Sequence, residues 1–103
     1  MEDDATPTAE PWQVMGENLE IMTGGIPWGR RMSFRVTKLE KGHVWGVQPW
    51  KERLVGDPDT GVIHGGVLTS FLDNLCGMAA SSALDKARFV STLDLRIDYM
   101  RAA

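Results

Sequence analysis

The chain has 103 residues, enough for one small domain. Hydrophobic residues make up 43% and charged residues 24%, a balance typical of globular domains that argues against disorder and coiled coil. The net charge of −3 gives no electrostatic reason to expect nucleic acid or an anionic membrane as a partner. The single cysteine rules out an intrachain disulfide and a multi-cysteine metal site.

The N-terminus is acidic and rich in Pro and Thr, so residues 1–9 are expected to form a flexible arm. Residues 10–103 are expected to form a single domain. The arm has no positively charged region followed by an apolar core, so no secretory signal is visible. No stretch approaches the roughly 18 apolar residues that a membrane span needs. A cytoplasmic protein without membrane contact is therefore expected.

A first helix is predicted after the arm because apolar residues recur at helical spacing. Thr8 is its expected cap, and the glycine pair at 24–25 ends it. Residues 27–29 then read as a connector, with the ring of Trp28 packed onto the core.

The hydrophobic period changes to two at Met32, which indicates a strand. A turn at residues 40–42 and a second strand at about 43–50 complete a predicted hairpin. Residues 51–61 are polar and rich in turn formers, so they are expected to form a loop.

Residues 65–84 contain small and apolar side chains with a single charge, Asp73. A helix that is apolar over most of its circumference is a buried central helix, and Cys76 is expected to be a core thiol on it. Thr69, Asp73 and Gly77 share one narrow stripe of this helix. Residues 92–99 then alternate strictly between apolar and polar side chains, which is the clearest strand pattern in the chain.

The glycines at the start of this helix form the most informative motif. Gly65 and Gly66 let a ligand approach the backbone closely, and the first amides of a helix have no intrahelical acceptor. Such amides can stabilise a carbonyl oxygen that gains negative charge during a reaction. Asp73 lies about 12 Å further along the axis, at about 1.5 Å per residue. The spacing therefore favours a site shared between two subunits.

Each of these residues also has a structural interpretation. The glycines could simply form a tight loop and a helix start, and Asp73 could be a carboxylate bonded to Thr69. His64 is better explained as fixing the loop ahead of the helix than as a catalyst. No metal-ligand cluster, P-loop or GxGxxG motif is visible, so neither a metal site nor a nucleotide cofactor is predicted.

The motif GVIHGGV at 61–67, followed by Leu-Asp-Asn at 72–74 and by TLDLRIDYMR at 92–101, resembles hotdog-fold acyl-CoA thioesterases of the phenylacetate-pathway (PaaI-like) type. The resemblance covers about residues 28–103. It implies an α+β fold, in which an antiparallel sheet wraps around a long central helix, and units that pair into a homodimer or homotetramer. It also implies an acyl-CoA thioester as substrate, with no cofactor beyond the CoA that the substrate carries.

The same resemblance implies roles for individual residues. The amide of Gly65 would polarise the thioester carbonyl, and Asp73 would act as general base or nucleophile. Thr92, or Ser91 with a shift of one residue, would orient the attacking water, and His64 completes the catalytic candidates. The candidates for substrate contacts are Gly66, Asp57 (where many relatives carry Asn), Asn74 and Arg101 (a plausible phosphate partner).

Length is the main departure from the family. Its domains continue for three further strands, which lie between the hairpin and the strand after the helix, and none follows Ala103. The sheet is therefore expected to be incomplete in this chain. A non-catalytic acyl-CoA-binding or structural hotdog fragment is the alternative to an active thioesterase.

Overall fold

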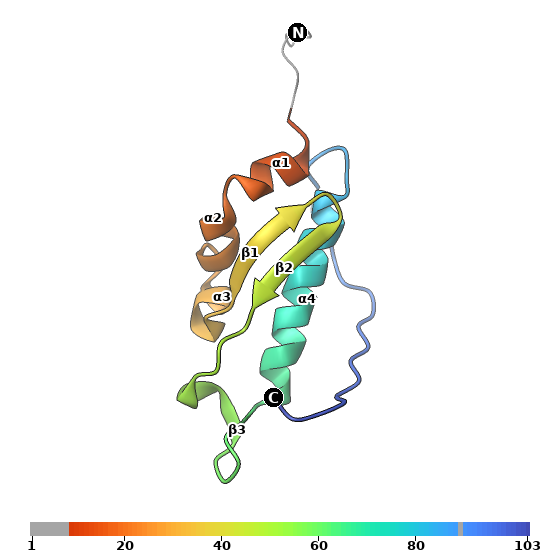
Figure 1. Cartoon of the computed structure of the whole chain (residues 1–103). Coiled ribbons are helices and arrows are strands. Elements are labelled where there is room, and N and C mark those ends of the chain that lie inside the picture. Colours follow the sequence, from red (N-terminus) through yellow and green to blue (C-terminus); the bar gives the residue numbers. More distant parts are fainter. Residues whose placement is uncertain (1–8, 89) are drawn as a thin grey trace, which may run out of the picture.

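The computed structural model describes residues 9–88 and 90–103, so residues 1–8 of the expected arm at 1–9, with Thr8 as the expected cap of the first helix, lie outside the described residues. The described residues form an α+β arrangement, as predicted (Figure 1). The elements in chain order are α1 (Pro11–Gly16), α2 (Leu19–Gly24), α3 (Pro27–Met32), β1 (Arg35–Glu40), β2 (His43–Val47), the 3-10 helix η1 (Glu52–Leu54), β3 (Val55–Asp57), β4 (Val62–Ile63) and α4 (Gly65–Ser82).

The N-terminal helix is interrupted, so the prediction of one continuous helix was wrong. Helix α1 begins after Glu10, whose backbone N–H donates to Oε1 of Gln13 at 2.8 Å. At the other end, the side-chain amide of Asn18 donates to the carbonyl of Val14 at 2.6 Å. Such a local bond competes with the helical pattern, and the chain bends before α2 begins.

The predicted connector at residues 27–29 is helical, since Pro27 occupies the first turn of α3, where it is tolerated. Trp28 is 50% exposed and does not pack onto the core as expected. The neighbouring Gly29 makes that contact. A Cβ added to Gly29 would lie 2.8 Å from the ring of Phe34, so the close approach of Gly29 to the core turns Trp28 outward.

The hairpin of β1 and β2 confirms the prediction of two antiparallel strands. A bulge between Val36 and Lys38 changes the side-chain alternation. As a result, Leu39 is buried on the same strand as Val36, although the two are three residues apart. The second strand ends at Val47, before the predicted end at residue 50.

Residues 51–61 contain more structure than the predicted loop. Strand β3 pairs antiparallel with β4, and η1 precedes the pair. The backbone N–H of His64 donates to the carbonyl of Leu54 at 2.9 Å, which ties this small ladder to the start of α4. The loop therefore fixes the position at which α4 begins.

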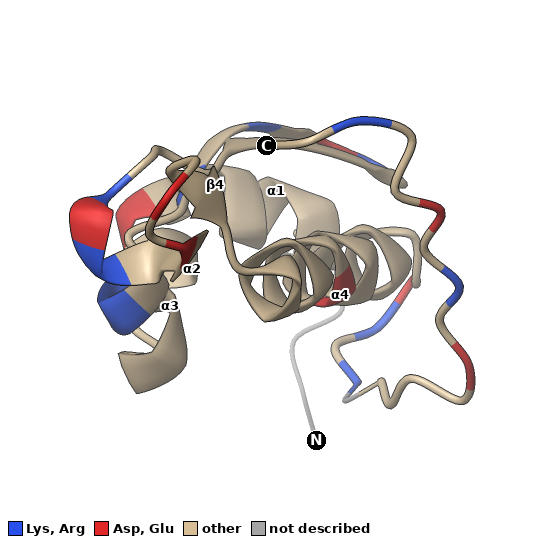
Figure 2. Ribbon diagram, turned by 90° about the horizontal axis from the view of Figure 1, so that it is seen from below, with Lys and Arg blue, Asp and Glu red and all other residues tan. Residues whose placement is uncertain are grey.

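The main core lies between one face of the hairpin and the helices. Phe34, Val36 and Met78 are buried together, with apolar side chains from α1, α2 and α4 packed around them. Figure 2 shows the helices on one side of the hairpin and the ribbon of α4 nearly free of charged residues. Gly46 allows α4 to approach β2 closely, because a Cβ there would lie 3.0 Å from the Leu75 side chain.

Ser82 connects the end of α4 to the hairpin turn. Its side chain is fully buried, accepts a hydrogen bond from the backbone N–H of Gly42 at 2.9 Å, and donates to the carbonyl of Ala79 at 2.8 Å, with the carbonyl of Glu40 at 3.4 Å. A buried hydroxyl needs such partners, and here they join two elements that are 40 residues apart.

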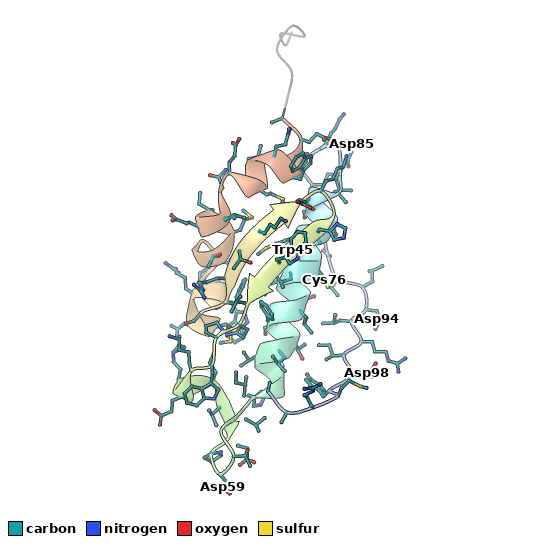
Figure 3. The ribbon with its side chains drawn as sticks, in the orientation of Figure 1. Trp45, Asp59, Cys76, Asp85, Asp94 and Asp98 are labelled. Carbon is teal, nitrogen blue, oxygen red and sulfur yellow. The ribbon has the colours of Figure 1, made fainter. Side chains whose placement is uncertain are left out.

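Helix α4 is less buried than predicted. Its buried residues are Val67, Met78 and Ser82, and Cys76 is exposed rather than a core thiol (Figure 3). One side of the helix packs against the hairpin, and nothing within residues 9–88 and 90–103 covers the rest as a sheet would. No helix in these ranges is both long enough and apolar enough to cross a membrane.

The clearest strand pattern, at residues 92–99, does not form a strand in the structure. The segment runs extended beside α4 but pairs with no other described strand, and Leu93 and Met100 are 99% and 89% exposed. A strand exists only through hydrogen bonds to a neighbour, so alternation alone does not create one. Figure 3 shows Asp94 and Asp98 on this segment.

Candidate active site

Asp73 and Thr92 meet on the side of α4 that faces the C-terminal segment. The hydroxyl of Thr92 donates to Oδ1 of Asp73 at 2.5 Å. The helix and the segment thus bring together the carboxylate and the hydroxyl that the resemblance paired. Ser91, the alternative to Thr92, is exposed and donates no side-chain hydrogen bond among the described residues.

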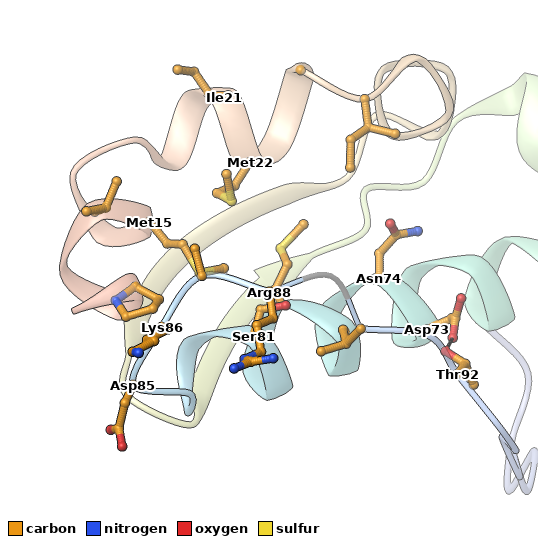
Figure 4. Close-up of a pocket in the computed structure, with 18 of the residues that line it drawn as sticks. Met15, Ile21, Met22, Asp73, Asn74, Ser81, Asp85, Lys86, Arg88 and Thr92 are labelled. Carbon is orange, nitrogen blue, oxygen red and sulfur yellow. Dashed lines mark hydrogen bonds between the residues drawn. The ribbon is translucent and has the colours of Figure 1, made fainter. Parts of the chain in front are cut away.

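A pocket of about 830 Å³ opens beside this pair, between α1, α2 and α4 (Figure 4). Asp73 and Thr92 lie at one end of it, and Lys86 and Arg88 lie further along. The wall between them is mainly apolar, with contributions from Met15, Val14, Ile21, Met22, Ile26, Met78 and Val90. A carboxylate at the end of an apolar pocket is suited to chemistry on a ligand with an apolar part.

The start of α4 presents one unoccupied amide. The backbone N–H of Gly66 donates to Nδ1 of His64 at 2.9 Å, and that of Val67 donates to the carbonyl of His64. Within the described residues the N–H of Gly65 donates no hydrogen bond. His64 therefore caps the helix, and Gly65, not Gly66, carries the amide that is available to a ligand.

Tyr99 contributes to this end of the helix, and the sequence did not single it out. Its hydroxyl donates to the carbonyl of Gly65 at 3.0 Å and lies 2.9 Å from the hydroxyl of Thr69. The alternation of residues 92–99 could have indicated this contact. Tyr99 is on the same side of the alternating segment as Leu95 and Ile97, and a hydroxyl that faces a helix needs a partner there.

The remaining candidates divide between the middle and the start of α4. Asn74 lines the large pocket, although its side-chain amide donates to the carbonyl of Ser70. Arg101 lines a smaller pocket of about 400 Å³ together with Gly65 and Tyr99.

Asp57 lies in neither pocket, because both of its carboxylate oxygens are used in the turn between β3 and β4. They accept from the N–H of Asp59 at 3.0 Å and from the hydroxyl of Thr60 at 2.9 Å. The structure gives Asp57 a turn-forming contact, and no contact with the residues proposed to bind substrate.

Gly65 and Asp73 line separate pockets. Eight residues of helix separate them by about 12 Å, and α4 is continuous between them. One carbonyl group cannot contact both within a single chain. Among the described residues, no three His, Cys, Asp or Glu side chains gather to form a metal site.

Comparisons with known proteins point to one family. Residues 60–103, which include α4 and the C-terminal segment, match the sequence profile of the family described as the thioesterase superfamily. A protein of Halobacterium salinarum that bears the provisional name of an esterase is 40% identical over 58 residues, which are 53% of this chain and 38% of that protein.

A solved structure shows a similar fold. The X-ray structure of a protein from the thioesterase superfamily, a structural genomics target, matches with a TM-score of 0.69 and 25% sequence identity. The match covers 82% of this chain and 65% of that one. The chain thus spans less than two thirds of the length of either relative. Its fold is the α+β hotdog fold of the thioesterase superfamily, as the resemblance implied.

Proposed function

We propose that this chain hydrolyses an acyl-CoA thioester to a free acid and CoA, and that it is of the PaaI-like type. The observation that carries the proposal is the Asp73–Thr92 pair, which lies at the end of an apolar pocket on a helix that begins with an available amide at Gly65. A thioesterase needs these two elements, a base for water and a donor for the carbonyl oxygen.

Asp73 acts as general base in the mechanism that we propose. Thr92 holds Oδ1, and Oδ2 accepts no hydrogen bond among the described residues, so Oδ2 is available to a water molecule. That water loses a proton to Oδ2 as its oxygen attacks the thioester carbon. The C–S bond then breaks, and the proton passes from Asp73 to the CoA thiolate. Direct attack by the carboxylate is the variant of this step that the sequence left open.

The Gly65 amide stabilises the oxygen of the tetrahedral intermediate. The positive end of the α4 dipole strengthens this N–H as a donor. Because Gly65 and Asp73 of one chain face different pockets, we propose that Gly65 of one copy works with Asp73 of another. The active unit is then a homodimer or homotetramer.

The apolar pocket supports the acyl part of the proposed substrate. Its volume of about 830 Å³ is within the range of small-molecule sites, and Met15, Met22 and Met78 give it an adaptable apolar wall. We assign Arg101 to the phosphates of CoA because it lies beside Gly65 in the smaller pocket. Cytoplasmic CoA esters are the substrates that this proposal expects.

A second candidate function is binding of acyl-CoA without hydrolysis. It is favoured by the same separation of Gly65 from Asp73, since a chain that stays monomeric would hold the acyl group beside an incomplete site.

A thiol-release assay over straight-chain and aromatic acyl-CoAs separates the two functions when it is run beside calorimetric binding. Turnover that requires Asp73 supports the thioesterase. Binding without release of CoA selects the second candidate, and the absence of both removes acyl-CoA from consideration.

A further inference from the structure

We infer that Tyr99 is a positioning residue that fixes the Gly65 amide through the Gly65–Gly66 peptide. This inference rests on the proposed function of that amide. Tyr99 belongs to the C-terminal segment, more than 30 residues after the helix start, and yet its hydroxyl donates to the Gly65 carbonyl at 3.0 Å. Thr69 donates to the same carbonyl at 3.1 Å from one turn further along the helix.

The two hydroxyls and the tyrosine ring enclose Gly65 from one side. Their oxygens are 2.9 Å apart, and a Cβ built on Gly65 would lie 3.3 Å from the Tyr99 oxygen and 3.5 Å from the ring carbon that carries it. Consecutive glycines have no side chains that limit their rotation, so contacts from outside the helix add to its own hydrogen bonds in fixing the direction of their amides. Tyr99 supplies one of them.

The second contact is on the other end of the same peptide unit. The carbonyl of Gly65 and the N–H of Gly66 belong to one peptide, and that N–H donates to Nδ1 of His64 at 2.9 Å. A donor on the carbonyl polarises the peptide and strengthens the bond that its N–H makes. Tyr99 therefore donates to the carbonyl of this peptide, and the N–H of the same peptide donates to His64.

This arrangement has two consequences for the site. His64 must accept at Nδ1, so a neutral ring carries its proton on Nε2. The Gly66 amide is occupied, which leaves Gly65 as the available donor at the helix start. Loss of the Tyr99 hydroxyl should loosen the Gly65–Gly66 peptide and misdirect the Gly65 N–H without removing it.

The test uses Tyr99→Phe in the full chain, which removes one oxygen and keeps the ring. Thr37→Val is the matched control, since it removes a hydroxyl on β1, far from α4 in the sequence. We expect the Gly66 amide to exchange with solvent about three- to tenfold faster in Tyr99→Phe, the loss of one ordinary hydrogen bond. The ¹⁵N shifts of the His64 ring should move toward a mixture of tautomers, and both signals should stay unchanged in the control.

Turnover of the best acyl-CoA substrate is the second readout. We expect kcat to fall about three- to tenfold with KM nearly constant, because the amide acts on the intermediate and not on the bound ester. Thr69→Val, which removes the other hydroxyl, should change both readouts in the same direction. A Tyr99→Phe chain with wild-type amide exchange and ring shifts overturns the inference, as does altered exchange with unchanged kcat.

Failure of the proposed function gives a different result. If the wild-type chain releases no CoA, the thioesterase assignment fails, while faster Gly66 exchange in Tyr99→Phe still upholds the positioning of the peptide.

Discussion

Two parts of helix α4 carry the candidate chemistry, and they are held in opposite ways. At its start, His64, Thr69 and Tyr99 occupy nearly every polar group and leave one amide available. In its middle, Asp73 is held by Thr92 through one oxygen and lines a pocket. A fixed donor needs no reorganisation when charge develops, whereas a base must reach a mobile water. At the helix start a substitution can therefore act by misdirecting the amide, whereas replacement of Asp73 acts by removing the base itself.

Replacement of the carboxylate should have the largest effect. Asp73→Asn keeps the size of the side chain and can still accept from Thr92, so folding should change little. Turnover should fall about 10²- to 10⁴-fold, the usual contribution of a general base. Steady-state kinetics and the melting temperature of the same sample check this, with exposed Asp94→Asn as control. Near-normal turnover, or a large loss of stability with turnover kept, would return Asp73 to a structural role.

Removal of the amide should have a slightly smaller effect. Gly65→Pro deletes the N–H at the first position of α4, where proline is tolerated, and the extended backbone of His64 (φ −57°, ψ 133°) suits a residue that precedes proline. We expect a loss of about 10²- to 10³-fold in kcat. Gly65→Ala is the matched control, because it adds the same Cβ beside Tyr99 and keeps the N–H. Equal losses in the two variants would mean that crowding, and not the amide, causes them.

Mixing the two variants tests whether the parts come from different copies. An equal mixture of Asp73→Asn and Gly65→Pro chains, unfolded and refolded together, contains mixed dimers in which one of two sites is intact. Activity should recover to about one quarter of wild type if dimers form at random. Recovery tracked by thiol release and by light scattering checks this. A mixture as inactive as its components, at a dimeric mass, would place both groups in one chain.

The smallest expected effect concerns the α1 wall of the Asp73 pocket. Hydrogen bonds from Trp12 and Lys41 lower the pKa of Glu10 below its ordinary 4.5, and the hydrogen bond to Glu10 raises the pKa of Lys41 above 10.5. Glu10 therefore contributes stability above pH 4.5 that is lost as the pH falls through its lower folded pKa. The Lys41 contribution is complete below pH 10.5 and is lost as the pH rises through its higher folded pKa.

Both groups are exposed, so the shifts in melting temperature should be small. Glu10→Gln should flatten the acid side of a melting profile while leaving its neutral part nearly unchanged. Glu20→Gln on α2 is the control. A profile for Glu10→Gln that follows the wild type at every pH would show that the contact with Lys41 contributes nothing to the α1 wall.

The sequence predicts secondary structure most accurately where the pattern within one segment determines it. The hairpin and α4 follow from periods of two and 3.6 residues, and the Asp73–Thr92 proximity follows from the resemblance. The predictions were wrong where the conformation of a segment depends on contacts with other parts of the chain. Trp28 turns outward because Gly29 takes its place against Phe34, and residues 92–99 pair with no strand of the part of the chain that the structure describes.

The candidate site shows the same limit. The role of His64 as a cap agrees with the structural interpretation that the sequence favoured, since it depends on a partner two residues away. Tyr99 escaped notice because its contact spans 34 residues. The engagement of Asp57 within its own turn could have been predicted, because Asp commonly bonds the backbone two residues on.

The buried hydroxyl of Ser82 determines how α4 is rotated about its own axis. Ser82 faces the hairpin turn, and each residue of a helix advances by about 100°. Asp73 is nine residues earlier, or about two and a half turns, which directs it away from the hairpin and toward the C-terminal segment. The contact between Ser82 and the turn at Gly42 thereby fixes the rotation of α4 about its axis, and with it the direction of the Asp73 carboxylate two and a half turns away. Any substitution that lets the end of the helix roll would swing Asp73 out of reach of Thr92, although neither residue had changed.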